Sequence, residues 1–379
     1  WEAVYGGDSS RSLEERFRKL LIRASEKYGR PCVVLVDEYD KSLLETLQDE
    51  NLLEHNKAVF KGFFGTLKSY DEYLKFVFIT GVTKFSRVSI FSDLNQLNDI
   101  SFTRAYASVC GITEKEMLQT FRPEIERIAE SLGLSFDESL SRLRAMYDGY
   151  HFDPLAEGVY NPFSLLKAMF DKKFGSYWVA TGTPTFLVKK LVATGFDARS
   201  FTNHKLYASS SELSDYRADN PNLTPLLYQT GYLTIVGHDS STGQLTMGFP
   251  NEEVKYGFLE SLLPVYAPET ATGKGNDIFS LNHCIDCGDL DGVRDIFTAL
   301  FASVPYGTDK NPAEYYFTSV IYVIFTLLGR FVQCEVHSAK GRADCIVEAK
   351  NYIYIFEFKL DKSTEEALRQ IEEQGYARP

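Results

Sequence analysis

Three side chains that can cooperate in a hydrolytic reaction lie near the C-terminal end of the sequence. They are Asp344, Glu357 and Lys359, placed on the two sides of Lys350-Asn351 in a stretch that predicts a β-hairpin. Strand residues alternate between faces, so Glu357 and Lys359 point the same way. A two-residue turn places Asp344 directly opposite Glu357, whereas a three-residue turn would oppose Asp344 to Phe356 and separate the groups.

Two carboxylates opposed across a hairpin repel each other unless a cation lies between them. Carboxylate oxygens and a backbone carbonyl, for which Phe358 is the candidate, suit Mg²⁺ or Mn²⁺. A metal held by Asp344 and Glu357 would activate water, and Lys359 would stabilise charge on phosphorus oxygens. These residues predict a metal-dependent phosphodiester hydrolase. The alternative is a solvated strand face, which commonly carries Glu and Lys.

A second pair of acids, Asp37 and Glu38, follows the apolar run CVVLV at 32–36. Such a run predicts a parallel strand covered on both faces, and KFVFIT at 75–80 predicts its neighbour. Ligands of α/β folds bind at the carboxyl ends of parallel strands, which is where these acids lie. The alternative is that Asp37 and Asp40 cap the following helix.

The elements that position both pairs fall into three predicted regions of an α/β chain. Residues 1–112 alternate helices and buried strands and predict a parallel sheet. Residues 113–269 are mainly helical, with one helix over MLQTFRPEIERIAESLG that ends at Gly133. Within them, 223–266 follows the order helix, hairpin, helix, which resembles a winged-helix module that contacts DNA or serves as a lid.

The third region, 278–379, predicts a helix from Ile278 to Ala302, a long buried helix, a strand, the hairpin and a final helix. The longest apolar run, 317–331, is shorter than the ~20 residues that a membrane span needs. With no signal peptide in view, the sequence predicts a cytoplasmic protein. The first residue is Trp1, which suggests a fragment.

The composition sets limits on the function. Lys+Arg 40 against Asp+Glu 52 gives a formal net charge of -12, which argues against a protein coated by a nonspecific basic nucleic-acid surface. The six cysteines are scattered and suit a reducing compartment, and Cys284 with Cys287 form a single CxxC without a second pair, so zinc is not expected. Substrate contacts are left to a local group of basic residues: Lys340, Arg342, Lys350, Lys359 and Lys362.

The pattern D-x12-E-x-K, preceded by Gly341-Arg342, resembles the PD-(D/E)XK nuclease superfamily. The resemblance continues into the next helix, where Ser363 and Glu366 form a capping box. It implies a site-facing role for Gln370 and adds two further acids near the metal. The residues that it implies as catalytic are Asp344, Glu357, Lys359, Gln370, Glu314 and Glu335.

The stretch PCVVLVDEYDK at 31–41 looks like a Walker B element, and FITGVTKFS at 78–86 looks like a sensor strand. The chain resembles a bacterial predicted AAA-ATPase fused to a PD-(D/E)XK domain, and the middle segments YDGYHF, VYNPFSLL and FPNEEV match the same pattern. The resemblance implies that Asp37 holds Mg²⁺ and that Glu38 polarises the attacking water. It implies that Thr80 or Thr83 senses the γ-phosphate of ATP, with Arg87 as a further candidate.

One departure from that pattern concerns the phosphate-binding loop. The motif G-x-x-x-x-G-K-[ST] does not occur in the sequence, and TGKGND at 272–277 lacks its spacing. The resemblance places the loop before the first residue, so the N-terminal portion is expected to be missing and ATP is expected to bind weakly. The family also continues beyond Pro379, so the C-terminal sheet is expected to be incomplete.

These observations predict an ATPase-coupled, metal-dependent nuclease that acts on DNA rather than RNA, with Mg²⁺ or Mn²⁺, and with ATP in the complete protein. No membrane partner is expected, and a homo-oligomer stays open. The first alternative is a nucleotide-gated module that binds nucleic acid or protein and carries an inactive nuclease-like domain. A second alternative is an ATP-driven remodeller whose C-terminal domain assembles subunits.

Overall fold

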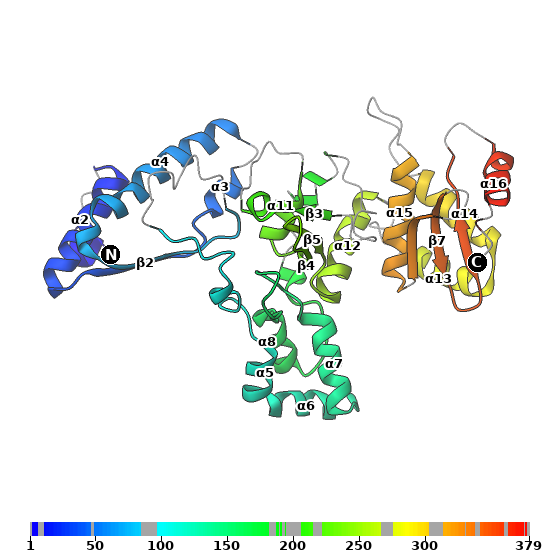
Figure 1. The fold of residues 1–379 in the computed structure, drawn as a ribbon, viewed down its shortest axis with the longest axis horizontal. Coiled ribbons are helices and arrows are strands. Elements are labelled where there is room, and N and C mark those ends of the chain that lie inside the picture. The colour runs from blue at the N-terminus through cyan, green and yellow to red at the C-terminus, as the bar shows by residue number, and fades with distance from the viewer. Residues whose placement is uncertain are drawn as a thin grey trace. The chain divides into compact units, whose positions relative to one another are not determined.

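The structure is a computed structural model of the 379-residue chain (Figure 1). It describes residues 2–6, 11–46, 49–84, 97–181, 187–188, 190–191, 194, 206–214, 222–266, 276–302, 314–329, 331–337, 342–359, 363–374 and 376. The chain divides into two compact units. The first comprises Trp1–Ala107, Ala208–Leu233 and Asp239–Leu245, and the second comprises Ser108–Tyr207, Thr234–His238 and Thr246–Pro379.

The first unit is built on a parallel pair of strands, β1 (Cys32–Val36) and β2 (Leu74–Ile79), as the sequence predicts. The helices before and between them are α1 (Glu2–Tyr5), α2 (Leu13–Tyr28), α3 (Lys41–Glu45) and α4 (Glu50–Ser69), followed by the 3₁₀ turn η1 (Asp71–Tyr73). Helix α2 begins where the Ser12 side chain accepts a hydrogen bond from Glu15 N and ends at Gly29 in the left-handed region. It packs against α4 and β1.

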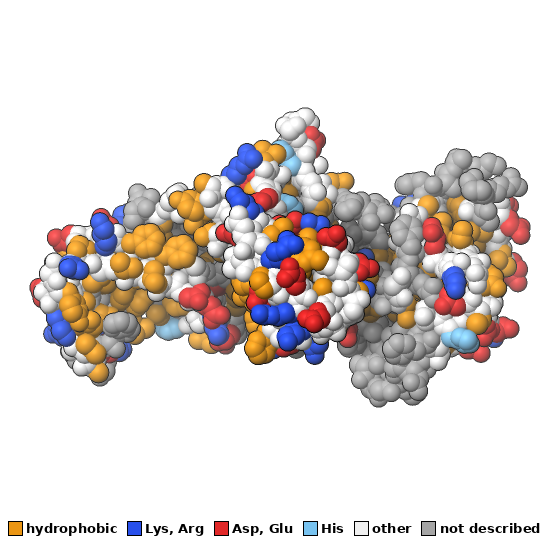
Figure 2. Space-filling model, turned by 90° about the horizontal axis from the view of Figure 1, so that it is seen from below, with side chains coloured by type: hydrophobic (Ala, Val, Ile, Leu, Met, Phe, Trp, Pro, Cys, Tyr) orange, Lys and Arg blue, Asp and Glu red, His pale blue; other side chains and the backbone are white. Residues whose placement is uncertain are grey.

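One face of the β1–β2 pair is apolar and exposed, contrary to the predicted strands covered on both faces. Val33 pairs with Phe76 and Leu35 pairs with Phe78, so the four side chains share a face. Val33 is 58% exposed and Leu35 69% exposed. Figure 2 shows hydrophobic side chains gathered over this part of the chain. The two described strands bury only the face against which α2 packs.

The helical part of the second unit consists of α5 (Glu114–Thr120), α6 (Arg122–Leu132), α7 (Phe136–Tyr147) and α8 (Pro162–Asp171). Met117, Ile125, Leu143 and Leu165 lie in its buried core. The single helix predicted up to Gly133 is wrong: Pro123 stands in the first turn of α6, so the chain begins a second helix after Phe121. Gly133 does end α6, in the left-handed region.

The other described elements between Arg104 and Tyr266 are a three-stranded sheet and several mostly short helices. Its elements are the 3₁₀ turn η2 (Arg104–Tyr106), η3 (Val179–Thr181), β3 (Leu206–Ala208), α10 (Ser210–Leu213), α11 (Thr224–Gln229), β4 (Thr234–Asp239), β5 (Gln244–Gly248) and α12 (Glu252–Tyr266). The strands form a sheet in the order β3-β5-β4. The predicted order of helix, hairpin and helix is present, and a winged-helix function stays a prediction.

The C-terminal part carries α13 (Asn276–Cys287), α14 (Leu290–Ala302), α15 (Glu314–Leu327), β6 (Phe331–His337), β7 (Arg342–Glu348), β8 (Ile353–Phe356) and α16 (Thr364–Glu373). The strands are antiparallel in the order β6-β7-β8. The single helix predicted for Ile278 to Ala302 is wrong, because Gly288 adopts a φ of 74° and Asp289 caps a new helix by accepting from Gly292 N at 3.0 Å. No helix within the described ranges is long and apolar enough to cross a membrane.

Candidate active site

The register of the C-terminal hairpin is the one predicted for a two-residue turn. Glu348 pairs with Ile353 and Cys345 pairs with Phe356, and Ala349 N donates to Tyr352 O at 2.8 Å. Strand β8 ends at Phe356, and the same register continued by one residue places Glu357 opposite Asp344. A three-residue turn, which would have separated the carboxylates, is excluded.

The aromatic face of the hairpin is the buried face. Phe356 contacts Phe325 of α15 and Phe297 of α14, with ring centroids 5.6 and 6.2 Å apart. The Tyr354 hydroxyl donates to Ile285 O of α13 at 2.6 Å. Glu357 follows directly after Phe356 at the end of β8, and the alternation of the strand continued by one residue places its side chain on the side opposite the aromatic face.

Glu357 is a buried carboxylate with one satisfied oxygen. Its side chain is 1% exposed, and its Oε1 accepts a hydrogen bond from Lys359 Nζ at 2.5 Å. Its Oε2 is buried and has no hydrogen-bond partner among the described residues. Burial raises the pKa of Glu357, the charge of Asp344 raises it further, and Lys359 opposes both effects. A buried carboxylate oxygen without a donor is costly and favours a cation beside it.

The second carboxylate, Asp344, organises the backbone that follows β8. Its Oδ2 accepts a hydrogen bond from Phe358 N at 2.8 Å. The structure therefore brings Asp344, Glu357 and Lys359 together. Phe358 joins them through its amide, and the predicted role of its carbonyl as a metal ligand stays a prediction.

Of the remaining residues predicted for this site, the structure describes the side chain of Gln370 but only the backbone of Glu314 and Glu335. Gln370 lies on α16, and its Nε2 donates to the Tyr376 hydroxyl at 3.3 Å. The backbone of Glu314 begins α15 and that of Glu335 belongs to β6, between the pairs Cys334 with Cys345 and Val336 with Ala343. The side chains of Glu314 and Glu335 lie outside the described residues.

A hard divalent cation fits the residues that the structure does place here. Within the described residues no group of three or more His, Cys, Asp or Glu side chains is arranged to hold a metal. The donor set that is present consists of the carboxylates of Asp344 and Glu357, and oxygen donors of this kind suit Mg²⁺, which takes one or two carboxylates and completes its shell with water and phosphate. The unpartnered Oε2 of Glu357 is the observation that favours such an ion.

The acids predicted for a nucleotide site lie at the carboxyl end of β1. Thr80 Oγ1 donates to Asp37 Oδ1 at 2.5 Å, so two of the predicted residues meet. Glu38 adopts a φ of 50°, which is uncommon for a residue other than glycine, and its side chain is 3.2 Å from Lys41 Nζ. The side chains of Asp37 and Glu38 are exposed.

Asp40 and Thr83 have a structural role that the sequence reading missed. Asp40 is fully buried and accepts from Val82 N at 3.0 Å, Thr83 N at 2.5 Å and Thr83 Oγ1 at 2.7 Å. It stands at the N-terminus of α3 but makes no side-chain capping bond, so the capping alternative is wrong for Asp40. The Thr83 hydroxyl is thus engaged by a carboxylate, while Arg87 lies outside the described residues. The sequence signal for this role is that Asp40 lies three residues after Asp37, close to the carboxyl end of the same strand.

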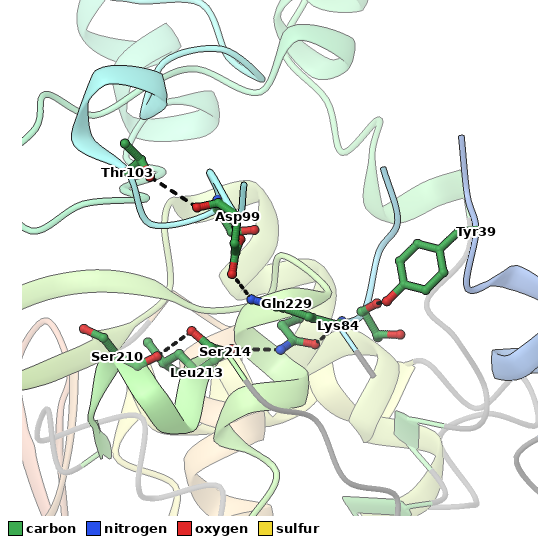
Figure 3. A network of polar contacts seen from close by, with 10 residues as sticks. Tyr39, Lys84, Asp99, Thr103, Ser210, Leu213, Ser214 and Gln229 are labelled. Carbon is green, nitrogen blue, oxygen red and sulfur yellow. Dashed lines mark hydrogen bonds and ion pairs between the residues drawn. The ribbon is translucent and has the colours of Figure 1, made fainter. Parts of the chain in front are cut away.

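The segment after β2 joins a polar network within the first unit (Figure 3). Lys84 N donates to Gln229 Oε1 at 2.8 Å, and Gln229 Nε2 donates to Leu213 O at 2.8 Å. Lys84 Nζ forms an ion pair with Asp99. Burial alone would raise the pKa of Asp99, but its hydrogen bonds with Lys84 and Ser101 outweigh burial and lower the pKa to about 2.

Comparison with protein families identifies an AAA-ATPase-like beginning and a nuclease-like end of the chain. Residues 1–91 match the family described as predicted AAA-ATPase, and residues 312–379 match the PD-(D/E)XK nuclease superfamily. The protein described as "Uncharacterized protein in vnfD 5'region" from Azotobacter chroococcum mcd 1 is 36% identical over 384 residues, which cover 97% of this chain and 70% of that protein. The chain belongs to the family of that protein. No solved structure matches it.

Proposed function

We propose that the chain is a metal-dependent nuclease that hydrolyses phosphodiester bonds, with DNA as its substrate and Mg²⁺ or Mn²⁺ as its cofactor. The observation that carries the proposal is the buried Glu357 carboxylate, opposite Asp344 in the hairpin register, with Oε2 unpartnered among the described residues. The match of residues 312–379 to the nuclease superfamily supports the same conclusion.

Each side chain has a distinct task in this proposal. Asp344 and Glu357 hold the cation, which acts as a Lewis acid for phosphodiester hydrolysis when bound. Asp344 is itself held by Phe358 N, so its carboxylate is positioned before a ligand arrives. Lys359, 15% exposed, keeps its ammonium beside Glu357 and supplies positive charge where the phosphorus oxygens become more negative. Gln370 orients water or phosphate from α16.

The N-terminal part is proposed to bind ATP when a phosphate-binding loop is available to it. Asp37 would hold Mg²⁺ and Glu38 would orient the attacking water, with Thr80 positioned by Asp37. Since the sequence has no G-x-x-x-x-G-K-[ST] motif, ATP hydrolysis by the 379-residue chain alone is expected to be very slow. Coupling of ATP to cleavage, a homo-oligomeric state and a cytoplasmic location remain predictions.

A binding module with an inactive nuclease-like domain is the second candidate. The ion pair between Lys359 and Glu357 favours it, because an ammonium already neutralises the carboxylate that would hold a metal. Incubation of linear and circular duplex DNA with the chain and Mg²⁺ or Mn²⁺ separates the two. We expect cleavage that is lost in Asp344→Ala with the fold retained. Equal cleavage by parent and variant would contradict the site, and tight DNA binding without cleavage would favour the second candidate.

A further inference from the structure

Tyr376 lies just after α16 and connects that helix to the start of β7. Its side chain is 8% exposed, and its N–H donates to Ile371 O at 3.2 Å, which continues the turn that ends the helix. Its hydroxyl oxygen accepts from Arg342 N at 3.1 Å and from Gln370 Nε2 at 3.3 Å. Tyr376 is therefore held at three points.

The Tyr376 hydroxyl has one hydrogen-bonding capacity left. A phenol oxygen has two acceptor lone pairs and one proton. Arg342 N and Gln370 Nε2 use both lone pairs, and no described residue accepts the proton. The two donors thus hold the oxygen in place, and its proton is directed at neither of them.

The Tyr376 hydroxyl lies beside the strand that carries Asp344, one of the two carboxylates of the candidate site. The hydroxyl contacts the backbone N–H of Arg342, which lies two residues before Asp344 on β7. Arg342 and Asp344 are separated by about 7 Å along the strand. Phosphate and sugar oxygens accept about half to two-thirds of protein–DNA hydrogen bonds, and the tyrosine hydroxyl is among the donors.

We propose that Tyr376 binds the substrate of the proposed nuclease by donating its hydroxyl proton to a non-bridging oxygen of the phosphate next to the one at the Asp344–Glu357 pair. The inference rests on the proposed function and assigns a specific phosphate contact to it. Arg342 N and Gln370 position the hydroxyl, and no bond to the phosphate is made or broken by Tyr376.

The test compares two variants that each remove a buried tyrosine hydroxyl from the C-terminal part. Tyr376→Phe removes the proposed donor, and Tyr354→Phe removes the hydroxyl that donates to Ile285 O, so it controls for lost stability. Both side chains are 8% exposed. Dissociation constants for a labelled DNA duplex are measured with Ca²⁺ as the divalent cation. We expect about 10- to 100-fold weaker binding for Tyr376→Phe, the loss typical of a hydrogen bond to a charged group, and less than about twofold for Tyr354→Phe.

A second measurement separates contact with phosphate from a purely structural role. The duplex is prepared with single neutral methylphosphonates at successive positions. One position should weaken binding by the parent chain and have no further effect on Tyr376→Phe, since the same contact cannot be lost twice. Additive effects at every position would overturn the inference. So would a parent chain that no single methylphosphonate weakens, a result that needs no variant to fold.

The outcomes distinguish this inference from the proposed function. Cleavage that depends on Asp344, with equal DNA affinity in Tyr376→Phe and Tyr354→Phe, would overturn the Tyr376 contact and leave the nuclease in place. DNA binding that depends on the Tyr376 hydroxyl, without cleavage under any divalent metal, would support the contact and contradict the nuclease. A parent chain that binds no DNA would overturn the contact.

Discussion

The ammonium of Lys359 lies 2.5 Å from Oε1 of Glu357, a carboxylate that is 1% exposed. The two residues are separated by Phe358 in the short segment that follows β8, and Asp344 holds the Phe358 amide between them. The ion pair offsets part of the cost of burying the Glu357 carboxylate when no metal is bound. It also holds the Lys359 ammonium beside the proposed site of phosphate hydrolysis.

Removal of Lys359 alone should destabilise the fold, because it leaves the Glu357 carboxylate buried without its cation. We expect Lys359→Met to lower the free energy of unfolding by about 3 kcal/mol. The double variant Glu357→Gln with Lys359→Met should recover most of that loss, since no buried charge remains. Urea denaturation of the parent, both single variants and the double variant measures the coupling. Additive losses would show that the pair does not interact as described.

Asp40 should matter more for stability than the neighbouring Asp37. Asp40→Asn keeps one acceptor but turns an amide NH₂ toward the donors of Val82 and Thr83. We expect a loss of about 2 to 4 kcal/mol. Asp37→Asn, at an exposed position, serves as the control and should cost less than about 1 kcal/mol. Chemical denaturation followed by circular dichroism distinguishes these values, and equal losses would contradict the structural role of Asp40.

The fold could be predicted from the sequence where pattern and turn chemistry agree. The apolar runs at 32–36 and 75–80 form parallel strands, and the turn length at Lys350-Asn351 fixed the register that opposes Asp344 to Glu357. Two helix breaks were missed. At the first, the hydrophobic periodicity is the same before and after Pro123, so it does not indicate that one helix ends and another begins there. At the second, Gly288 adopts a positive φ between two segments that both have helical periodicity.

Side-chain partners at long sequence separation could not be predicted in the same way. The Asp40 bonds to Thr83 depend on the order of two strands and on the path of both following loops. The Tyr376 contact with Arg342 N depends on how α16 returns to the sheet. Neither has a periodic signal, because each joins single residues from separate elements. The sequence predicted candidate acids, and the structure showed which are buried and what each one contacts.

Glu253 should make stability depend on pH in an unusual direction. Its side chain is buried, and Oε1 accepts from Tyr177 N at 2.5 Å and Trp178 N at 2.8 Å. Burial raises the pKa of Glu253 above its ordinary value. Its contribution to stability is therefore fully present below the unfolded-state pKa and is lost as the pH rises through the raised folded-state pKa.

Glu253→Gln removes this titration and keeps an oxygen for both amides. The melting temperature of the variant relative to the parent should therefore increase between pH 4 and pH 7, because only the parent loses stability through this group. Thermal unfolding of both proteins in matched buffers across this range measures the difference. A difference that is constant, or that falls with rising pH, would contradict the raised pKa.

Gly149 should tolerate no side chain, in contrast to Gly133. Gly149 has a φ of 98°, and a Cβ there would lie 2.1 Å from Pro250 O. Gly133 also has a positive φ, 65°, but a Cβ there meets nothing within 4 Å. We expect Gly133→Ala to cost about 1 kcal/mol from backbone conformation, and Gly149→Ala to cost about 3 kcal/mol or more. Similar losses in urea denaturation would show that Pro250 does not lie against Gly149.

We propose that Asp344 and Glu357 hold one divalent cation at the end of the hairpin. Titration calorimetry of Mg²⁺ and Mn²⁺ into the parent chain and into the double variant Asp344→Ala with Glu357→Ala tests it directly. We predict binding near one ion per chain for the parent that disappears in the variant, with circular dichroism unchanged. Equal binding by both proteins, or no binding by the parent, would contradict a metal site at this hairpin.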